Sequence, residues 1–181
     1  VVLPANVNMA IYNLPMFGLG GCTDAKIVDQ QAAAEAALTL MAETLGGANL
    51  IHDLAYMESG LCGSLAQLVI CNEMVGWIEK MMTPFEINEE TLALDLIDEV
   101  GPDGSFLDSD HTLNHFRDLY YPDVFERGNY DQWLENGGLS LGERAAKLVD
   151  TVLEEHQPEP LSEDIQQKLK AIVQRAEQSF G

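Results

Sequence analysis

Four side chains that can titrate, donate a hydrogen bond or hold a cation gather in residues 49–60, NLIHDLAYMESG, after a short apolar run. Among them, His52 is followed directly by Asp53, whose carboxylate can hold one ring nitrogen and fix the tautomer of the imidazole. The other ring nitrogen is then available to a substrate as an acid, a base or a hydrogen-bond donor. A histidine that ends a strand and bonds only to backbone fits the same sequence, so both interpretations stay open.

Tyr56 and Glu58 add an aromatic face and a carboxylate to the same stretch. An aromatic ring beside a negative charge suits a quaternary or tertiary ammonium better than an anion. Either residue alone fits an ordinary loop position equally well. The stretch as a whole therefore predicts a small cationic ligand, with Tyr56 and Glu58 as candidate contacts.

A second polar cluster, Cys22 to Asp24, follows the glycine-rich apolar piece LPMFGLGG, residues 14–21. Ligands of parallel α/β proteins bind at the carboxyl ends of the strands, where the following loops converge. We therefore expect the two clusters to lie side by side, which makes Asp24 and Cys22 further candidate contacts. The glycines match neither G-x-G-x-x-G nor a P-loop, so a phosphate site is not indicated.

His111 and His115 are four residues apart, a spacing at which two histidines on one helix face can bind a metal ion. The sequence shows no third ligand, and HTLNH lacks the glutamate of the zinc-protease pattern. We therefore predict no metal site and expect surface or interhelical roles for both residues. The three cysteines are an odd number without C-x-x-C spacing, which argues against disulfides or zinc, and Cys71 is expected in the core.

The elements that position these residues alternate between strand and helix as far as Pro84. Crossover connections of this length join parallel strands, so the fold class is α/β. The predicted elements are a strand in residues 14–21, a helix from Asp29 to Gly46, a buried strand in residues 48–53, and a helix opened by a capping box of Ser64 and Gln67.

Strand patterns disappear after Pro84. Asn88 is the predicted N-cap of a helix that runs to Gly101, and further helical patterns cover residues 108–125, 141–156 and 162–180. We therefore predict two regions: βα units in residues 1–83, and a helical C-terminal region in residues 84–181 that packs on them.

The chain is strongly acidic, with 30 Asp and Glu against 9 Lys and Arg and a formal net charge of −21. Such a field repels phosphate backbones and attracts cations, so nucleic acid is not an expected partner. The acidity fits a purely solubilising role as well. No membrane span or basic leader is evident, which predicts a cytoplasmic protein, and the start at Val1 suggests a piece of a longer chain.

Three pieces in order, GGCTDAK, LIHD followed by ESGL, and HTLNHFRD, make the chain similar to the C-terminal part of the trimethylamine methyltransferase superfamily. The resemblance implies a (β/α)8 TIM-type barrel, of which this chain supplies the last strands and the C-terminal helical region. It also implies transfer of a methyl group from a methylamine or quaternary amine to the Co(I) of a separate corrinoid protein. Cobalamin is then carried by that partner, and no cofactor is expected on this chain.

The resemblance also implies roles for the residues above. His52 orients the substrate with Asp53 behind it, Tyr56 and Glu58 hold the cation, and Asp24 and Cys22 are neighbours. The pyrrolysine of the archetypal members is expected near Gly18 to Cys22, where this chain has ordinary residues, so a betaine is favoured over trimethylamine. The alternative is a noncatalytic fragment that binds a cationic ligand or a partner protein, because the open strand edges of an incomplete barrel invite association, including homo-oligomers.

Overall fold

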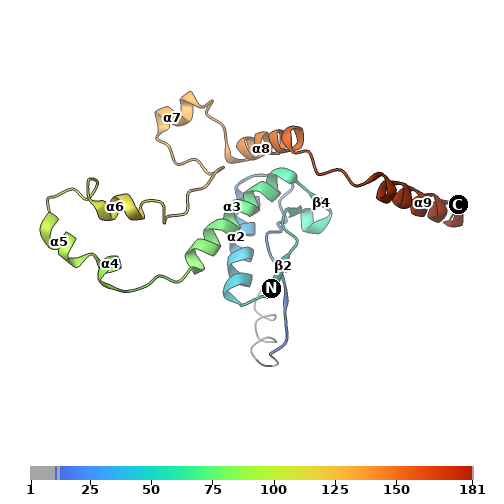
Figure 1. The fold of residues 1–181 in the computed structure, drawn as a ribbon. Coiled ribbons are helices and arrows are strands. Elements are labelled where there is room, and N and C mark those ends of the chain that lie inside the picture. Colours follow the sequence, from blue (N-terminus) through green and yellow to red (C-terminus); the bar gives the residue numbers. More distant parts are fainter. Residues whose placement is uncertain (1–10, 12, 181) are drawn as a thin grey trace. The chain divides into compact units, whose positions relative to one another are not determined.

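The computed structural model describes residue 11 and residues 13–180, in two compact units, Val1–Val149 and Asp150–Gly181. The N-terminal stretch VVLPANVNMA, whose lack of basic residues contributed to the predicted location, lies outside the described residues. Figure 1 shows the elements along the chain. Up to Met82 they are β1 (Phe17–Leu19), α2 (Gln30–Leu45), β2 (Leu50–His52), β3 (Tyr56–Met57), the 3-10 helix η1 (Glu58–Gly60), β4 (Cys62–Gly63) and α3 (Leu65–Met82).

β1 and β2 pair in parallel, as predicted, with Phe17 opposite Leu50 and Leu19 opposite His52. Gly18 faces α2 so closely that a Cβ there would lie 2.6 Å from Oε2 of Glu43. Because side chains alternate along a strand, Phe17 and Leu19 point to the opposite face. The strand predicted in residues 48–53 is present as β2, but its predicted burial is wrong, because Leu50 is 55% exposed. Within the described residues this sheet has only two strands, and its second face is uncovered.

The main core lies between α2 and α3, which begin where the sequence predicts. Asp29 caps α2 by accepting hydrogen bonds from the backbone N–H groups of Gln31 and Ala32, and Ser64 caps α3. Cys71 is fully buried, in agreement with the prediction. Fully burying a Leu, Ile or Met side chain of this cluster stabilises the fold by about 1.5–3 kcal/mol. The buried cluster consists of Ala36, Leu40, Ile70, Cys71, Met74, Ile78, Val124 and Ala145.

The predicted capping box at Ser64 is only half formed. Oγ of Ser64 accepts a hydrogen bond from the N–H of Gln67 at 3.3 Å, but the N–H of Ser64 donates to the backbone oxygen of Ala55. The Gln67 side chain is buried and its Nε2 donates to the backbone oxygen of Ala32 at 3.1 Å. Gln67 therefore joins α3 to the first turn of α2 instead of closing the cap.

After α3, the chain forms shorter helices than the sequence predicts. The expected helix from Asn88 to Gly101 is split at Ala93, which has a left-handed φ of 46°. The expected helix in residues 108–125 covers only Asp110–His115. The elements are α4 (Glu89–Leu92), α5 (Leu94–Val100), α6 (Asp110–His115), α7 (Tyr130–Glu135), which was not predicted, α8 (Leu141–Glu155) and α9 (Glu163–Phe180).

Residues 120–125 return to α3. The buried carboxylate of Glu73 accepts a hydrogen bond from the N–H of Val124 at 3.1 Å, and Trp77 packs against the rings of Tyr120 and Phe125. The first turns of α8 also join the core through Ala145. Part of the predicted helical region thus packs on the βα units.

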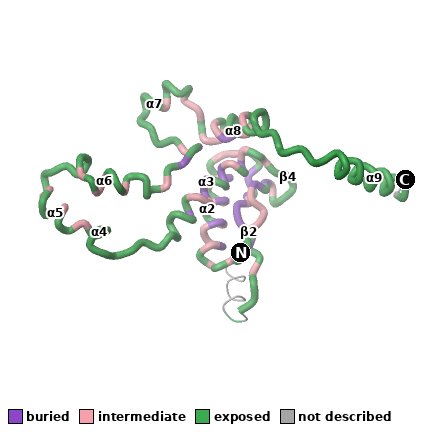
Figure 2. Tube along the Cα trace, in the orientation of Figure 1, coloured by how far each residue is buried: buried purple, intermediate pink, exposed green. Residues whose placement is uncertain are grey.

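The second unit consists of the end of α8 and the whole of α9. Figure 2 shows α9 as exposed along its length, in contrast to the buried residues of α2 and α3. The strands in the described part of the chain form two separate two-stranded sheets. Of the helices described, none has the length and apolar content to cross a membrane.

Candidate functional site

A groove of about 710 Å³ lies where the loops after β1 and β2 meet one side of α2. Strand β1 supplies its apolar wall and the two loops supply polar groups. The lining residues are Phe17, Gly18, Leu19, Cys22, Thr23, Asp24, Glu35, Thr39, Glu43, Asp53, Tyr56, Ser59 and Gly60. Four acidic residues and two aromatic residues therefore line one concave surface.

The two polar clusters lie side by side because backbone hydrogen bonds join their loops. The N–H of Thr23 donates to the oxygen of Tyr56 at 2.9 Å, and the N–H of Glu58 donates to the oxygen of Ala25 at 3.1 Å. A side-chain bond of 2.5 Å from Oγ of Ser59 to Oδ1 of Asp24 adds to this connection. Two strand ends that are far apart in sequence thus form one rim.

The loop after β2 contains a hairpin that the sequence pattern does not predict. β3 and β4 pair antiparallel, and the residues before and after β3 adopt left-handed backbone conformations, with φ of 72° at Asp53, 71° at Ala55 and 51° at Glu58. Such conformations in residues other than glycine cost about 1–3 kcal/mol each and cluster at functional sites. The strained backbone is a second reason to treat this loop as a candidate functional site.

His52 lies at the end of β2, with its Nδ1 2.6 Å from Oδ1 of Asp53. Its ring also packs on Phe17, with ring centroids 4.1 Å apart. A carboxylate at Nδ1 keeps the proton there and leaves Nε2 as an acceptor. Asp53 lines the groove, whereas His52 lies beside it on the β1–β2 sheet, so a substrate role for His52 stays a prediction.

The other predicted site residues also divide into those that line the groove and those that do not. Asp24, Cys22 and Tyr56 line the groove, and the Tyr56 ring is about half exposed. Glu58 is partly buried at the start of η1, outside the lining residues. Burial raises the pKa of the Cys22 thiol, with Asp53 and Asp24 adding to the effect, so Cys22 is a neutral thiol at pH 7.

Three polar residues of α2 were missed by the sequence reasoning: Glu35, Thr39 and Glu43. They are spaced by four along an otherwise Ala-rich and Leu-rich helix, so they form one polar stripe on one face. That spacing was the available signal. The stripe forms the helical wall of the groove.

Glu35 and Thr39 hold the first loop in place. Oε2 of Glu35 accepts hydrogen bonds from Oγ1 of Thr23 at 2.6 Å and from the N–H of Asp24 at 2.8 Å. Oγ1 of Thr39 accepts from the N–H of Gly21 at 3.0 Å. The bond from Thr23, with those from Gln31 and Asp24, lowers the pKa of the Glu35 carboxyl, which is therefore ionised at neutral pH.

Glu43 differs because its carboxylate is almost fully buried, at 3% exposure, and Oε2 has no hydrogen-bond partner among the described residues. A buried carboxylate without partners is unfavourable unless something compensates its charge. The backbone of Gly18 packs against this oxygen, where an added Cβ would lie 2.6 Å from it. Because Glu43 also lines the groove, it is a candidate contact for a cation there.

A family model described as trimethylamine methyltransferase (MTTB) matches residues 6–181. The chain belongs to this family. Among curated members, a trimethylamine methyltransferase of Desulfitobacterium hafniense (strain DSM 10664 / DCB-2) is 38% identical over 170 residues, which are 94% of this chain and 34% of that protein. That of Methanosarcina barkeri (strain Fusaro / DSM 804) is 34% identical over 169 residues, 93% of this chain and 34% of its own length.

A further member of the trimethylamine methyltransferase family, the glycine betaine methyltransferase of Desulfitobacterium hafniense (strain Y51), is 32% identical over 172 residues, 94% of this chain and 36% of that protein. The chain spans about a third of the length of these curated relatives. Membership of the family, expected from the three sequence pieces, is confirmed.

Proposed function

We propose that this chain forms part of a methyltransferase that moves a methyl group from a quaternary amine or methylamine, with a betaine as the favoured donor, to the Co(I) of a corrinoid protein. Relatives named trimethylamine methyltransferase and glycine betaine methyltransferase support the reaction class. The observation that supports a cationic substrate is the groove, whose lining includes Asp53, Tyr56 and Glu43, with one Glu43 oxygen lacking a hydrogen-bond partner among the described residues.

The residues of this chain would act by binding and orientation. A quaternary nitrogen is already a good leaving group, so the protein has mainly to fix the methyl group in line and exclude water. Glu43 and Asp53 would hold the positive charge and Tyr56 would cover it with its ring. His52 would meet the carboxylate end of a betaine as an imidazolium, with Nδ1–H donating to Asp53 and Nε2–H donating to the substrate carboxylate.

The corrinoid of the partner protein would supply the nucleophile that accepts the methyl group. Among the described residues that line the groove there is no lysine or arginine to hold an anionic cofactor group. The donor set therefore fits the amine, and the cofactor is better assigned to the partner.

The architecture belongs to the same proposal. The order β1, α2, β2, α3 with parallel pairing fits two consecutive units of a (β/α)8 barrel. Both strands would then gain a neighbour on their outer edges from the remainder of the barrel. In a structure of a longer chain, an antiparallel strand paired with the outer edge of β1 or β2 would overturn this arrangement.

The test is a methyl-transfer assay on a chain of the length of the relatives, with Co(I) corrinoid protein and a panel of betaines and methylamines. Methylation of cobalt is followed by its absorbance. We expect transfer from at least one quaternary amine, and Glu43→Gln to raise the amine KM at least tenfold while Glu79→Gln, an exposed carboxylate on α3, does not. No transfer from any amine would refute the proposal.

A noncatalytic role stays the second candidate because β1 and β2 present open edges and exposed apolar side chains, including Phe17 and Leu50. Such edges pair readily with another chain. This candidate predicts binding of a betaine, seen by calorimetry, without methyl transfer by any longer form of the chain. Turnover in the assay above excludes it.

A further inference from the structure

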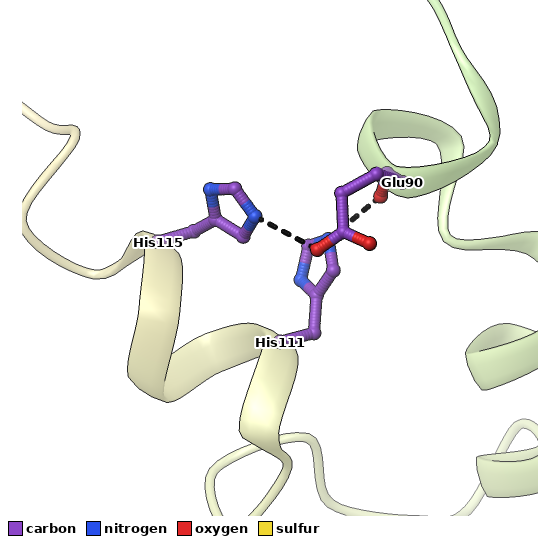
Figure 3. Close-up of side chains that lie close together, drawn as sticks. All are labelled: Glu90, His111 and His115. Carbon is purple, nitrogen blue, oxygen red and sulfur yellow. Dashed lines mark hydrogen bonds and ion pairs between the residues drawn. The ribbon is translucent and has the colours of Figure 1, made fainter.

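Outside the groove, the loop after α3 contains an open cleft of about 900 Å³ between α4–α5 and the start of α6. Six of its thirteen lining residues are acidic, and one is a histidine, His111. At its edge, Glu90 of α4 and the two histidines of α6 lie together (Figure 3), with one ligand atom from each within 4.8 Å of the others. The sequence shows only the histidine pair, and folding adds the carboxylate of Glu90, 21 residues before His111, as the third ligand.

We propose that Glu90, His111 and His115 bind a divalent transition-metal ion, zinc being the best match, which fastens α4 to α6. Two imidazoles and one carboxylate, with a water molecule in the fourth position, are a common donor set for Zn²⁺. This site is separate from the proposed methyl transfer and does not depend on it.

The distances are close to those of a bound state. A zinc ion lies about 2.1 Å from nitrogen and oxygen ligands, so two ligands at a tetrahedral angle are about 3.4 Å apart. Nε2 of His115 lies 3.3 Å from Oε1 of Glu90. The pair can therefore take up an ion between them with small side-chain movements.

Each histidine has a partner that orients its ring. Oδ2 of Asp118 lies 2.7 Å from Nδ1 of His115, which holds the proton on that nitrogen and leaves Nε2 for the ion. Such a carboxylate behind a ligating histidine is a regular part of metal sites. His111 donates its Nε2–H to the backbone oxygen of Glu90 at 2.9 Å, so its neutral ring keeps a lone pair on Nδ1.

The surrounding charge favours a cation. Oδ2 of Asp118 lies 2.7 Å from one ring nitrogen of His115 and Oε1 of Glu90 lies 3.3 Å from the other, so two carboxylates place negative charge at this ring. Asp95, Glu99 and Asp110 line the adjacent cleft. A metal ion brings more positive charge than one proton and meets the same field.

A cross-link here has a structural purpose. α4 has four residues and α6 has six, far below the length of about 12–15 residues at which an isolated helix holds in water. An ion shared by residues 90, 111 and 115 would strengthen a connection at which Glu90 accepts hydrogen bonds from both histidines.

The test uses the full chain without a polyhistidine tag, freed of metal with EDTA and titrated with ZnSO₄ against a chromogenic chelator. We expect one tight equivalent. His111→Ala and His115→Ala should each weaken it at least a hundredfold, and Asp118→Asn by 10–100-fold, as for other residues behind a ligand. His156→Ala, at the end of α8, is the matched control and should leave the affinity unchanged.

Co²⁺ provides a second readout that does not depend on stability. We expect visible d–d bands of a four-coordinate nitrogen and oxygen site, which Glu90→Gln changes and His156→Ala does not. Circular dichroism checks that each variant is folded. Zinc affinity equal in His111→Ala, His115→Ala and the parent chain would show that the ion binds only the acidic surface, and the proposal would be wrong.

Discussion

Two regions of the first unit hold their helices in different ways. In the βα region, residues 13–83, α2 and α3 have 16 and 18 residues and bury a shared face around Leu40 and Ile70. In the connecting segment, residues 84–139, the helices have four to seven residues, and large apolar side chains stay in solvent, with Phe85 at 82% and Leu107 at 86% exposure.

The difference between the regions shows what local hydrogen bonds can do without a packed core. α4, α6 and α7 each begin after a cap residue whose side chain accepts a hydrogen bond from a backbone N–H of the first turn. The cap residues are Asn88, Ser109 and Asn129. α4 and α7 complete a full capping box. Caps set where a short helix starts but contribute only about 1 kcal/mol each. The βα region is therefore expected to dominate the free energy of unfolding.

The largest expected effect is Leu40→Ala in α2. Leu40 is 2% exposed, so its removal leaves a cavity and should lower the free energy of unfolding by about 2–5 kcal/mol. The control is Leu113→Ala in α6, where the side chain is 67% exposed and the change should stay within about 0.5 kcal/mol. Urea titration followed by circular dichroism measures both. Similar losses would erase the contrast between the regions.

The next effect concerns the link between the two regions. Glu73→Ala leaves the N–H of Val124 without its acceptor and should cost about 1–3 kcal/mol. Glu79→Ala on the exposed face of the same helix is the control. Because Trp77 packs on Phe125, its fluorescence in a Trp133→Phe background reports release of residues 120–125. Unchanged fluorescence in Glu73→Ala would mean that the aromatic contacts alone hold the link.

A smaller effect is expected from Asn88→Ala, which removes the cap of α4 and should destabilise that helix by about 1 kcal/mol. Hydrogen exchange of the α4 amides should speed up, while exchange in α2 and α3 stays the same. Asn72→Ala, an exposed position inside α3, serves as the comparison. Faster exchange throughout the chain would show that the connecting segment and the βα region unfold as one.

The smallest effect is a pH dependence within the βα region. The folded state lowers the pKa of Glu35, so its contribution is present above the ordinary glutamate pKa and is lost as the pH falls through the lowered value. Acid unfolding of the parent chain should therefore be steeper than that of Glu35→Gln below about pH 4.3. Parallel acid-unfolding curves for the two proteins would contradict this assignment.

The fold of the βα region could be predicted from its sequence because local and tertiary signals agree there. Asp29 and Ser64 cap helices whose apolar residues also pack, so both starts were found. In residues 84–125 the helical pattern was real but lacked a surface to pack on. There, the turn at Ala93 and the return of Val124 to Glu73 depend on contacts that no local pattern encodes.

For the candidate site, the order of strands and helices in the sequence predicted which loops form the rim. It did not predict that α2 forms the helical wall of the groove. Asp24, Asp53 and Tyr56 follow strands, and parallel pairing alone brings them to one rim. Glu43 was overlooked because an acidic residue near a helix end usually faces water. Its burial follows from the closeness of β1, which becomes apparent only when the strand lies on the helix.

The close approach of β1 to α2 depends on Gly18, where even a methyl group would meet both Glu43 and Ala48 at under 3.0 Å. The packing of β1 on α2 is thus encoded by a residue with no side chain. Searches that rank positions by their chemistry pass over it. Transfer of this groove to another scaffold would require a glycine at the matching strand position as well as the carboxylates.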